Sequence, residues 1–344
     1  MQKPPMKTAS PRSSKSWQPE FSIVQLIRYV ANLRTAPPTM CRTAGTQIGE
    51  IREVLGIYRA ELRNVGIMMQ VWDNQSKAAF LEKLTLSPLF AIPAYLTMVS
   101  GREFAVRTKT CWGDSMQVVV PESGSISIAT TGILEPELTK WMLTNLQPGM
   151  IVIDIGAHFG YYTLLSSTQV GQSGQVHAFE PAPSTFLVLK GNTRLRKNIY
   201  LNQTAAFSTN GSMNLLDYGR RFSGFNTLLR PRMSGLVRPS RVSVPTLRID
   251  DYVRLRDFDP DFVKIDAESS EWDIIVGMDE VIDRCHPIIS IEVGDFVQNA
   301  ARSRDIIKHL LGKGYNAFDL GTGTLRKHVL RNTYEYGNIL LMAS

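Results

Sequence analysis

A short stretch near the middle of the chain, residues 149–163, constrains the fold more than any other. Residues 151–155 read Ile-Val-Ile-Asp-Ile, an apolar run that is rich in β-branched side chains, contains one carboxylate and stops at Gly156. Such a run is typical of a buried parallel strand that ends in a tight turn. The turn leads directly into the largely apolar residues 161–165, so its glycines lie where a strand passes into a helix N-terminus. Junctions of this kind bind the polar parts of nucleotides.

The residues of the turn indicate which nucleotide. A dinucleotide site requires G-x-G-x-x-G, because its middle glycine allows backbone N–H groups to approach a pyrophosphate. This chain has Asp154-x-Gly156-x-x-x-Gly160, with Ala157 and His158 where a phosphate needs bare backbone. The carboxylate of Asp154 would repel a phosphate and attract a cation. S-adenosylmethionine carries an ammonium and a sulfonium and no phosphate, so it fits better than NAD or ATP, and the chain has no G-x-x-x-x-G-K-[ST] loop.

A second carboxylate follows the next predicted strand. Residues 175–179 read Gln-Val-His-Ala-Phe and lead into Glu180-Pro181. Glu180 comes 26 positions after Asp154, close to the length of one strand-helix-strand unit and to the spacing at which an acidic residue meets ribose hydroxyls. A carboxylate accepts hydrogen bonds from both hydroxyls at once. The two acids together predict a nucleoside-type cofactor.

The amino-acid composition is typical of an ordinary soluble globular protein. The 344 residues suffice for one large or two modest domains, with 43% hydrophobic and 20% charged side chains. The cysteines, Cys41, Cys111 and Cys285, are odd in number and widely spaced, so they build neither a disulfide framework nor a zinc site, and we expect a reducing, cytoplasmic location.

The net charge of +7 comes from the N-terminal part, because residues 1–109 hold 15 Lys/Arg and 7 Asp/Glu. We expect a disordered basic tail over 1–20, without a secretory signal, although a transit peptide remains an alternative. Helical spacing predicts a small helical region over 21–100. Its basic surface could meet nucleic acid, an anionic membrane or an acidic partner, or could be a solvated helical face. No apolar run reaches the ~20 residues of a transmembrane helix.

The remaining chain is expected to form one α/β domain, residues 101–344. Alternation predicts hairpin strands at 104–106, 116–120 and 126–128, before a helix that opens at 135–137. From residue 180 helices and strands alternate, which implies a parallel sheet covered on both faces. We expect helices at 184–196, 248–253, 271–277 and 301–311, and strands at 200–206, 262–266, 288–293, 315–318 and 338–341. Residues 210–244 are expected to be loops or a hairpin beside the site.

With these residues in place, the chain resembles the FkbM family of S-adenosylmethionine-dependent methyltransferases over residues 132–341. The Lys-Ile-Asp-x-Glu sequence at 264–268 is the most specific part, because other class I methyltransferases lack it. The resemblance implies the Rossmann-like class I fold, with a seven-stranded, mostly parallel sheet whose last strand is antiparallel. The matching blocks are residues 132–137, 152–160, 179–181, 192–198, 244–251, 263–271 and 289–293.

The resemblance also implies roles for matching positions. Asp154, Gly156 and Gly160 would hold the methionine end of the cofactor, and Glu180 would hold the ribose. Asp266, at the tip of the fourth parallel strand, would face the transferring methyl group or the acceptor. The family usually has Asn in place of His158 and Gly in place of Ser269. The candidate cofactor contacts are Glu135, Asp154, Gly156, Ala157, His158, Gly160, Glu180, Pro181, Ala206 and Asp266.

The candidate catalytic residues are Asp266, His158 and Glu292. Methyl transfer mainly requires alignment of donor, methyl and acceptor, and a hydroxyl acceptor also requires a base. Asp266 is the first candidate for that base; His158 is either a base or a backbone-facing turn residue. Glu292, costly to bury unpaired, should meet Lys264 or a substrate group. Asp266, Glu268 and Glu292 could together ligate a magnesium-like ion, but the donor needs none, so no metal is assigned.

The expected activity is O-methylation of a hydroxyl on a small molecule, sugar or glycolipid. A basic N-terminal region leaves methylation of RNA or protein as an alternative. A cofactor-binding scaffold that has lost the reaction is another, because fold alone does not settle function. The oligomeric state and the acceptor do not follow from these patterns.

Overall fold

The computed structural model describes residues 102–228, 238–295, 302–321 and 324–344. All of them belong to one compact unit, Trp72–Ser344. The expected basic tail over 1–20 and helical region over 21–100 lie outside the described residues.

A mixed sheet forms the centre of this unit, and within the described residues it has eight strands in the order β12-β11-β13-β10-β9-β3-β4-β5. β3, β4, β5, β9 and β10 run parallel, and β13 runs antiparallel to β10 and β11. The class I fold is thereby confirmed, with the short edge strand β12 added to the seven expected. The strands are β3 Ile151–Ile155, β4 Gln175–Phe179, β5 Ile199–Asn202, β9 Phe262–Ile265, β10 Ile288–Val293, β11 Tyr315–Leu320, β12 Leu325–Lys327 and β13 Gly337–Ala343.

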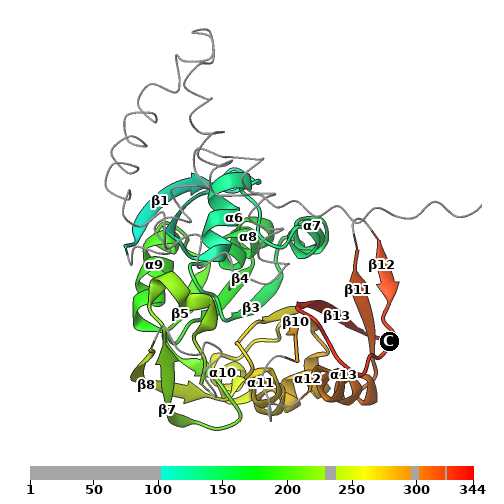
Figure 1. Ribbon diagram of the computed structural model, residues 1–344. Helices are drawn as coiled ribbons and strands as arrows, with labels where there is room; N and C mark the ends of the chain where they lie inside the picture. The colour runs from blue at the N-terminus through cyan, green and yellow to red at the C-terminus, as the bar shows by residue number, and fades with distance from the viewer. Residues whose placement is uncertain (1–101, 229–237, 296–301, 322–323) are drawn as a thin grey trace, which may run out of the picture. The chain divides into compact units, whose positions relative to one another are not determined.

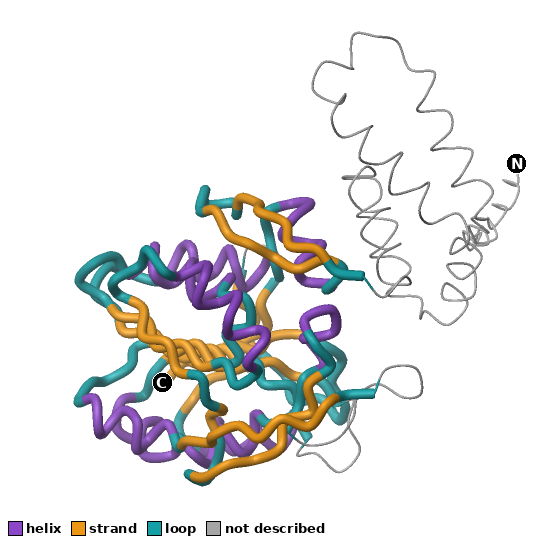
Figure 2. The backbone as a smooth tube through the Cα atoms, turned by 90° about the vertical axis from the view of Figure 1, so that its left-hand side faces the viewer, coloured by secondary structure: helices purple, strands orange, loops and turns teal. Residues whose placement is uncertain are grey.

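Helices cover both faces of the sheet (Figures 1 and 2). One face carries α7 Pro136–Asn145 and α8 Tyr161–Val170, and its apolar core includes Leu138, Met142 and Leu165. α9 Pro183–Thr193 contacts α8 and the hairpin strand β2. The opposite face carries α10 Ile249–Arg256, α11 Glu271–Gly277, α12 Asp279–Cys285 and α13 Ser303–Gly312. Burial on both faces explains why the central strands are nearly continuous apolar runs.

The expected hairpin is present as β1 Phe104–Lys109 and β2 Ser115–Val120, which pair antiparallel. The strand predicted at 126–128 is wrong, because these residues lie in helix α6 Ser123–Thr131. Glu122 caps that helix, since its carboxylate accepts from Gly124 N at 2.8 Å and Ser125 N at 2.6 Å. Three alternating residues are too few to distinguish a strand from the buried side of a capped helix.

The region expected as loops or a hairpin contains the antiparallel pair β7 Gly211–Asp217 and β8 Ser240–Leu247. The short helix η3 Arg220–Phe225 lies between them in sequence. The single strand predicted at 200–206 is divided, because β5 joins the main sheet whereas β6 Ala205–Ala206 pairs with β8 in a three-stranded sheet. No helix of the described ranges is long and apolar enough to cross a membrane.

Candidate functional site

The site is built at the carboxyl ends of neighbouring parallel strands, where ligands bind in sheets of this kind (Figure 1). β3 carries Asp154, and Glu180 directly follows β4. β9 is followed by Asp266, and β10 carries Glu292. Because β4, β3, β9 and β10 are adjacent in the sheet, four acidic residues separated by up to 138 positions reach the same edge.

The turn after β3 is closed by its own backbone. Gly156 N and Ala157 N each donate to the carbonyl oxygen of Phe179 at 3.0 Å. Gly156 has φ +77°, and a Cβ at this position would lie 1.7 Å from the carbonyl oxygen of Asp266. Glycine is therefore required at position 156, because the backbone after β3 is in direct contact with the backbone after β9. These two N–H groups are already bonded, which agrees with a turn that does not cradle a phosphate.

Two positions where the chain departs from the usual family residues have left-handed backbone. His158 has φ +52° and Ser269 has φ +83°. Asn and Gly, the residues usual in the family, both adopt this conformation readily, and His does so more often than most residues. Both substitutions thus preserve the turn geometry, with steric strain at Ser269.

Glu180 lies beside this turn and is 6% exposed. Its carboxylate accepts from His158 N at 3.0 Å and from Ala182 N at 2.9 Å. Burial raises the pKa of Glu180 to about 7, although the two backbone hydrogen bonds oppose the shift. The group therefore changes its charge near neutral pH.

Asp154 is buried behind the turn, with 1% exposure. Oδ2 accepts a hydrogen bond of 2.6 Å from the Thr163 hydroxyl on α8. Burial raises the pKa of Asp154, and the positive charge of Lys264 acts in the opposite direction. Oδ1 is buried and has no hydrogen-bond partner within the described residues. A buried carboxylate oxygen without a donor is costly, so this atom is suited to a cationic ligand.

Residues 154–317, which begin at this aspartate, match the family model for the methyltransferase FkbM domain. This segment of the chain is therefore similar to the methyltransferase FkbM domain. The protein is an S-adenosylmethionine-dependent methyltransferase, as the resemblance stated above implied.

Solved structures that resemble this methyltransferase include methyltransferase FkbM from Methylobacillus flagellatus, with 14% identity, a TM-score of 0.37, and coverage of 76% of this chain and 60% of that chain. Fibrillarin from Aeropyrum pernix with bound S-adenosyl-L-methionine has 14% identity and a TM-score of 0.34, with coverage of 58% and 68%. These TM-scores are low, so the family assignment rests on the match over residues 154–317. No curated protein matches the chain.

In this FkbM domain, the Lys-Ile-Asp-x-Glu sequence places a buried ion pair next to Asp154. Lys264 Nζ donates to Asp266 Oδ2 at 2.9 Å, and the Lys264 side chain is 2% exposed. Nζ also lies 4.9 Å from the centre of the Tyr162 ring, within range of a cation–π interaction. Burial disfavours the ammonium, but Asp266 and Asp154 outweigh it and raise the pKa of Lys264. Lys264 is therefore charged at neutral pH.

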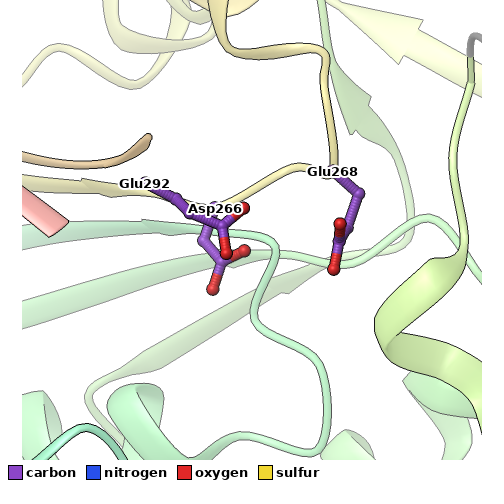
Figure 3. Close-up of side chains that lie close together, drawn as sticks. All are labelled: Asp266, Glu268 and Glu292. Atoms are coloured by element: carbon purple, nitrogen blue, oxygen red, sulfur yellow. The ribbon is translucent and has the colours of Figure 1, made fainter. Parts of the chain in front are cut away.

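Asp266 also lies close to two further carboxylates. One ligand atom each of Asp266, Glu268 and Glu292 lies within 4.8 Å of the others. Figure 3 shows Asp266 and Glu292 next to each other and Glu268 across from them. Glu292 is buried, whereas Asp266 and Glu268 are half-buried. These atoms are close enough together to hold one metal ion, so the expectation that the site uses no metal stays a prediction.

Glu135 connects the start of α7 with the last strand. Its Oε2 accepts from the Tyr162 hydroxyl at 2.7 Å, and Oε1 accepts from Asn338 Nδ2 at 2.8 Å and from the Tyr336 hydroxyl at 3.3 Å. Tyr336 is 56% exposed, but its hydroxyl bonds to Glu292, and desolvation of this hydroxyl and the Glu292 charge raise the pKa of Tyr336. Lys264 pairs with Asp266, and Tyr336 is one partner of Glu292; a contact of Glu292 with a substrate group stays a prediction.

The other predicted residues lie in different surroundings. The ring of His158 places Nε2 2.6 Å from Ser223 Oγ in η3, and burial lowers its pKa, so the ring is neutral. Ala157 is buried and Pro181 is half-buried. Ala206 belongs to the apolar core of the α10–α13 face.

Sequence reasoning did not find several residues of the site. In the sequence, Tyr162 is recognisable only as a residue in the first turn of a predicted helix. Ser223 lies in a segment that has neither helical nor strand periodicity. Tyr336 and Asn338 lie about 200 positions from Glu135. The antiparallel position of β13 beside β10, given by the class I fold, was the one signal that could have indicated them.

Proposed function

We propose that this enzyme transfers the methyl group of S-adenosylmethionine to a hydroxyl of a small molecule, sugar or glycolipid. The proposal rests chiefly on one observation, the meeting of Asp266, Glu268 and Glu292 next to the turn after β3. A hydroxyl is a weak nucleophile until its proton is removed, and a carboxylate at this place is a suitable acceptor for that proton.

The donor site is proposed from the buried acids. The unpartnered Oδ1 of Asp154 suits the ammonium of the methionine part, and Glu180 suits the ribose hydroxyls. The glycines of the turn and Glu135, Ala157, His158, Pro181 and Ala206 complete the proposed surroundings. We further propose that residues 101–344 constitute the methyltransferase domain, with the β1–β2 hairpin as its N-terminal extension.

When bound, S-adenosylmethionine supplies an electrophilic methyl group on a sulfonium. Asp266 orients the acceptor hydroxyl and takes its proton, and the hydrogen bond from Lys264 to Oδ2 fixes the position of this carboxylate. Glu292 and Glu268 accept hydrogen bonds from further polar groups of the acceptor. His158, which is neutral and bonded to Ser223, positions the turn rather than the acceptor. The oxygen–methyl bond forms as the sulfur–methyl bond breaks, and the proton passes to the carboxylate.

The test is release of S-adenosylhomocysteine with panels of sugars, glycolipids, small alcohols, RNA and protein. We expect turnover with a hydroxyl compound, and in Asp266→Asn a fall in kcat of about 10²–10⁴-fold with an unchanged Kd for S-adenosylmethionine. Asp257→Asn is the matched control, because Asp257 is exposed after α10 and asparagine tolerates its left-handed backbone.

Methylation of RNA or protein alone would contradict the proposed acceptor. Binding of S-adenosylmethionine without methyl transfer to any compound in these panels would indicate that the protein is a cofactor-binding scaffold.

A further inference from the structure

Lys264 lies in the middle of the sheet, where a charged side chain is rarely found. It is on β9, and the strands on either side place Asp154 of β3 and Ser290 of β10 level with it. Its side chain is 2% exposed. Burial of a lysine is costly unless opposite charges compensate it, so its position next to the donor site needs a reason.

The neighbours of Lys264 supply that compensation from two sides. Asp266 bonds directly to the ammonium, and Asp154, on the adjacent strand, acts on it electrostatically. The negative charge of Asp266 raises the pKa of the buried Asp154, so without a nearby cation Asp154 would retain its proton to higher pH. Titratable and charged groups face Lys264 or its partner Asp266 from all the surrounding elements; they are Asp154, Glu135, Tyr162, His158, Glu268, Glu271, Glu292 and Tyr336.

We propose that Lys264 is a positioning residue that keeps Asp154 and Asp266 ionised together, so that the cationic donor and the acceptor proton each meet a carboxylate. The proposal rests on the proposed donor site at Asp154. On balance burial raises the pKa of Asp154, and the charge of Lys264 opposes this shift, which is the direction that the proposed role requires. The cation–π contact with Tyr162 further fixes the position of the ammonium.

The first test does not depend on the donor. Wild type, Lys264→Met and Lys264→Arg are compared by thermal unfolding between pH 5.5 and 8.5. In Lys264→Met, one carboxylate of the pair takes up a proton that it lacks in the unfolded chain, so stability is lost as pH rises. The Tm difference from wild type should widen with pH for Lys264→Met and stay constant for Lys264→Arg. A packing role would give a constant difference in both.

The second test measures binding of S-adenosylmethionine by calorimetry from pH 6 to pH 9. The Kd of Lys264→Met divided by that of wild type should rise at least tenfold as pH falls, because a retained proton must leave before the cation binds. Titration of the ligand itself cancels in this ratio. The Lys264→Arg ratio should be flat, as should that of Lys313→Met, which removes a surface lysine paired with Asp279.

Flat ratios and constant Tm differences for Lys264→Met would overturn the proposal. So would a Lys264→Met protein that is unfolded at acid pH, since protonated carboxylates need no cation, or a Lys264→Arg protein that behaves like Lys264→Met. Failure of the wild type to bind S-adenosylmethionine would count against the proposed donor site, while the unfolding test would still decide the role of Lys264.

Discussion

Glu180 gives the donor site a pH dependence that can be calculated. Its pKa of about 7 means that roughly 90% of the carboxyl is ionised at pH 8 and about 10% at pH 6. If only the carboxylate binds the ribose, affinity for S-adenosylmethionine rises with pH through the neutral range. The perturbation that isolates this effect is Glu180→Gln, which resembles the protonated group at every pH.

The expected size follows from the contacts. A hydrogen bond to a charged group contributes about 1.5–3 kcal/mol, so loss of one such bond weakens binding at pH 8 by roughly 10–150-fold. At pH 6 the wild type is itself largely protonated. The ratio of the Kd of Glu180→Gln to that of wild type should therefore fall about tenfold between pH 8 and pH 6.

Isothermal titration calorimetry at half-unit pH steps measures this ratio, in which titration of the ligand cancels. Glu280→Gln is the control, because its side chain is 61% exposed and pairs with Arg254 on the surface. A ratio that does not change with pH would refute the reasoning, since it would mean that the ionisation of Glu180 does not govern ribose binding.

Two further predictions concern stability. Gly156→Ala should lower Tm far more than Gly171→Ala. Both glycines have positive φ, but only the Cβ at Gly156 meets backbone, whereas Gly171 has open space and incurs only the backbone strain of about 1–3 kcal/mol. Similar losses in both would contradict the contact with Asp266. Burial lowers the pKa of His177 to about 4, so the unfolded chain binds one more proton between pH 4 and 6.5 and stability should fall by up to about 1.4 kcal/mol per pH unit as pH decreases. In urea unfolding, His177→Phe should lose this contribution, and an unchanged slope would exclude it.

The arrangement of helices and strands could be predicted because periodicity and turns agree along most of the chain. The predicted limits of β4, β10 and α11 coincide with those observed. The error at 126–128 arose where an alternating pattern was short and the capping carboxylate of Glu122 decided the outcome. α12 and β12 were missed because each is short, and α12 follows α11 without a break signal.

The candidate site was predictable where its residues end core strands. Asp154, Glu180, Asp266 and Glu292 follow from strand order alone, because parallel strands bring their carboxyl ends together. The contacts of Glu135 were not predictable from local patterns, since they join segments about 200 positions apart. Long-range side-chain contacts depend on how the elements pack, and one sequence shows only the spacing within each element.

The central claim is that acids at the ends of β3 and β4 hold a cationic methyl donor, with Asp266 on the side of the acceptor. A crystal structure with S-adenosylhomocysteine tests it most directly. We predict the ribose hydroxyls on Glu180, the amino group on Oδ1 of Asp154 and the sulfur facing Asp266. A ligand bound elsewhere, or a ribose without contact to Glu180, would contradict the account.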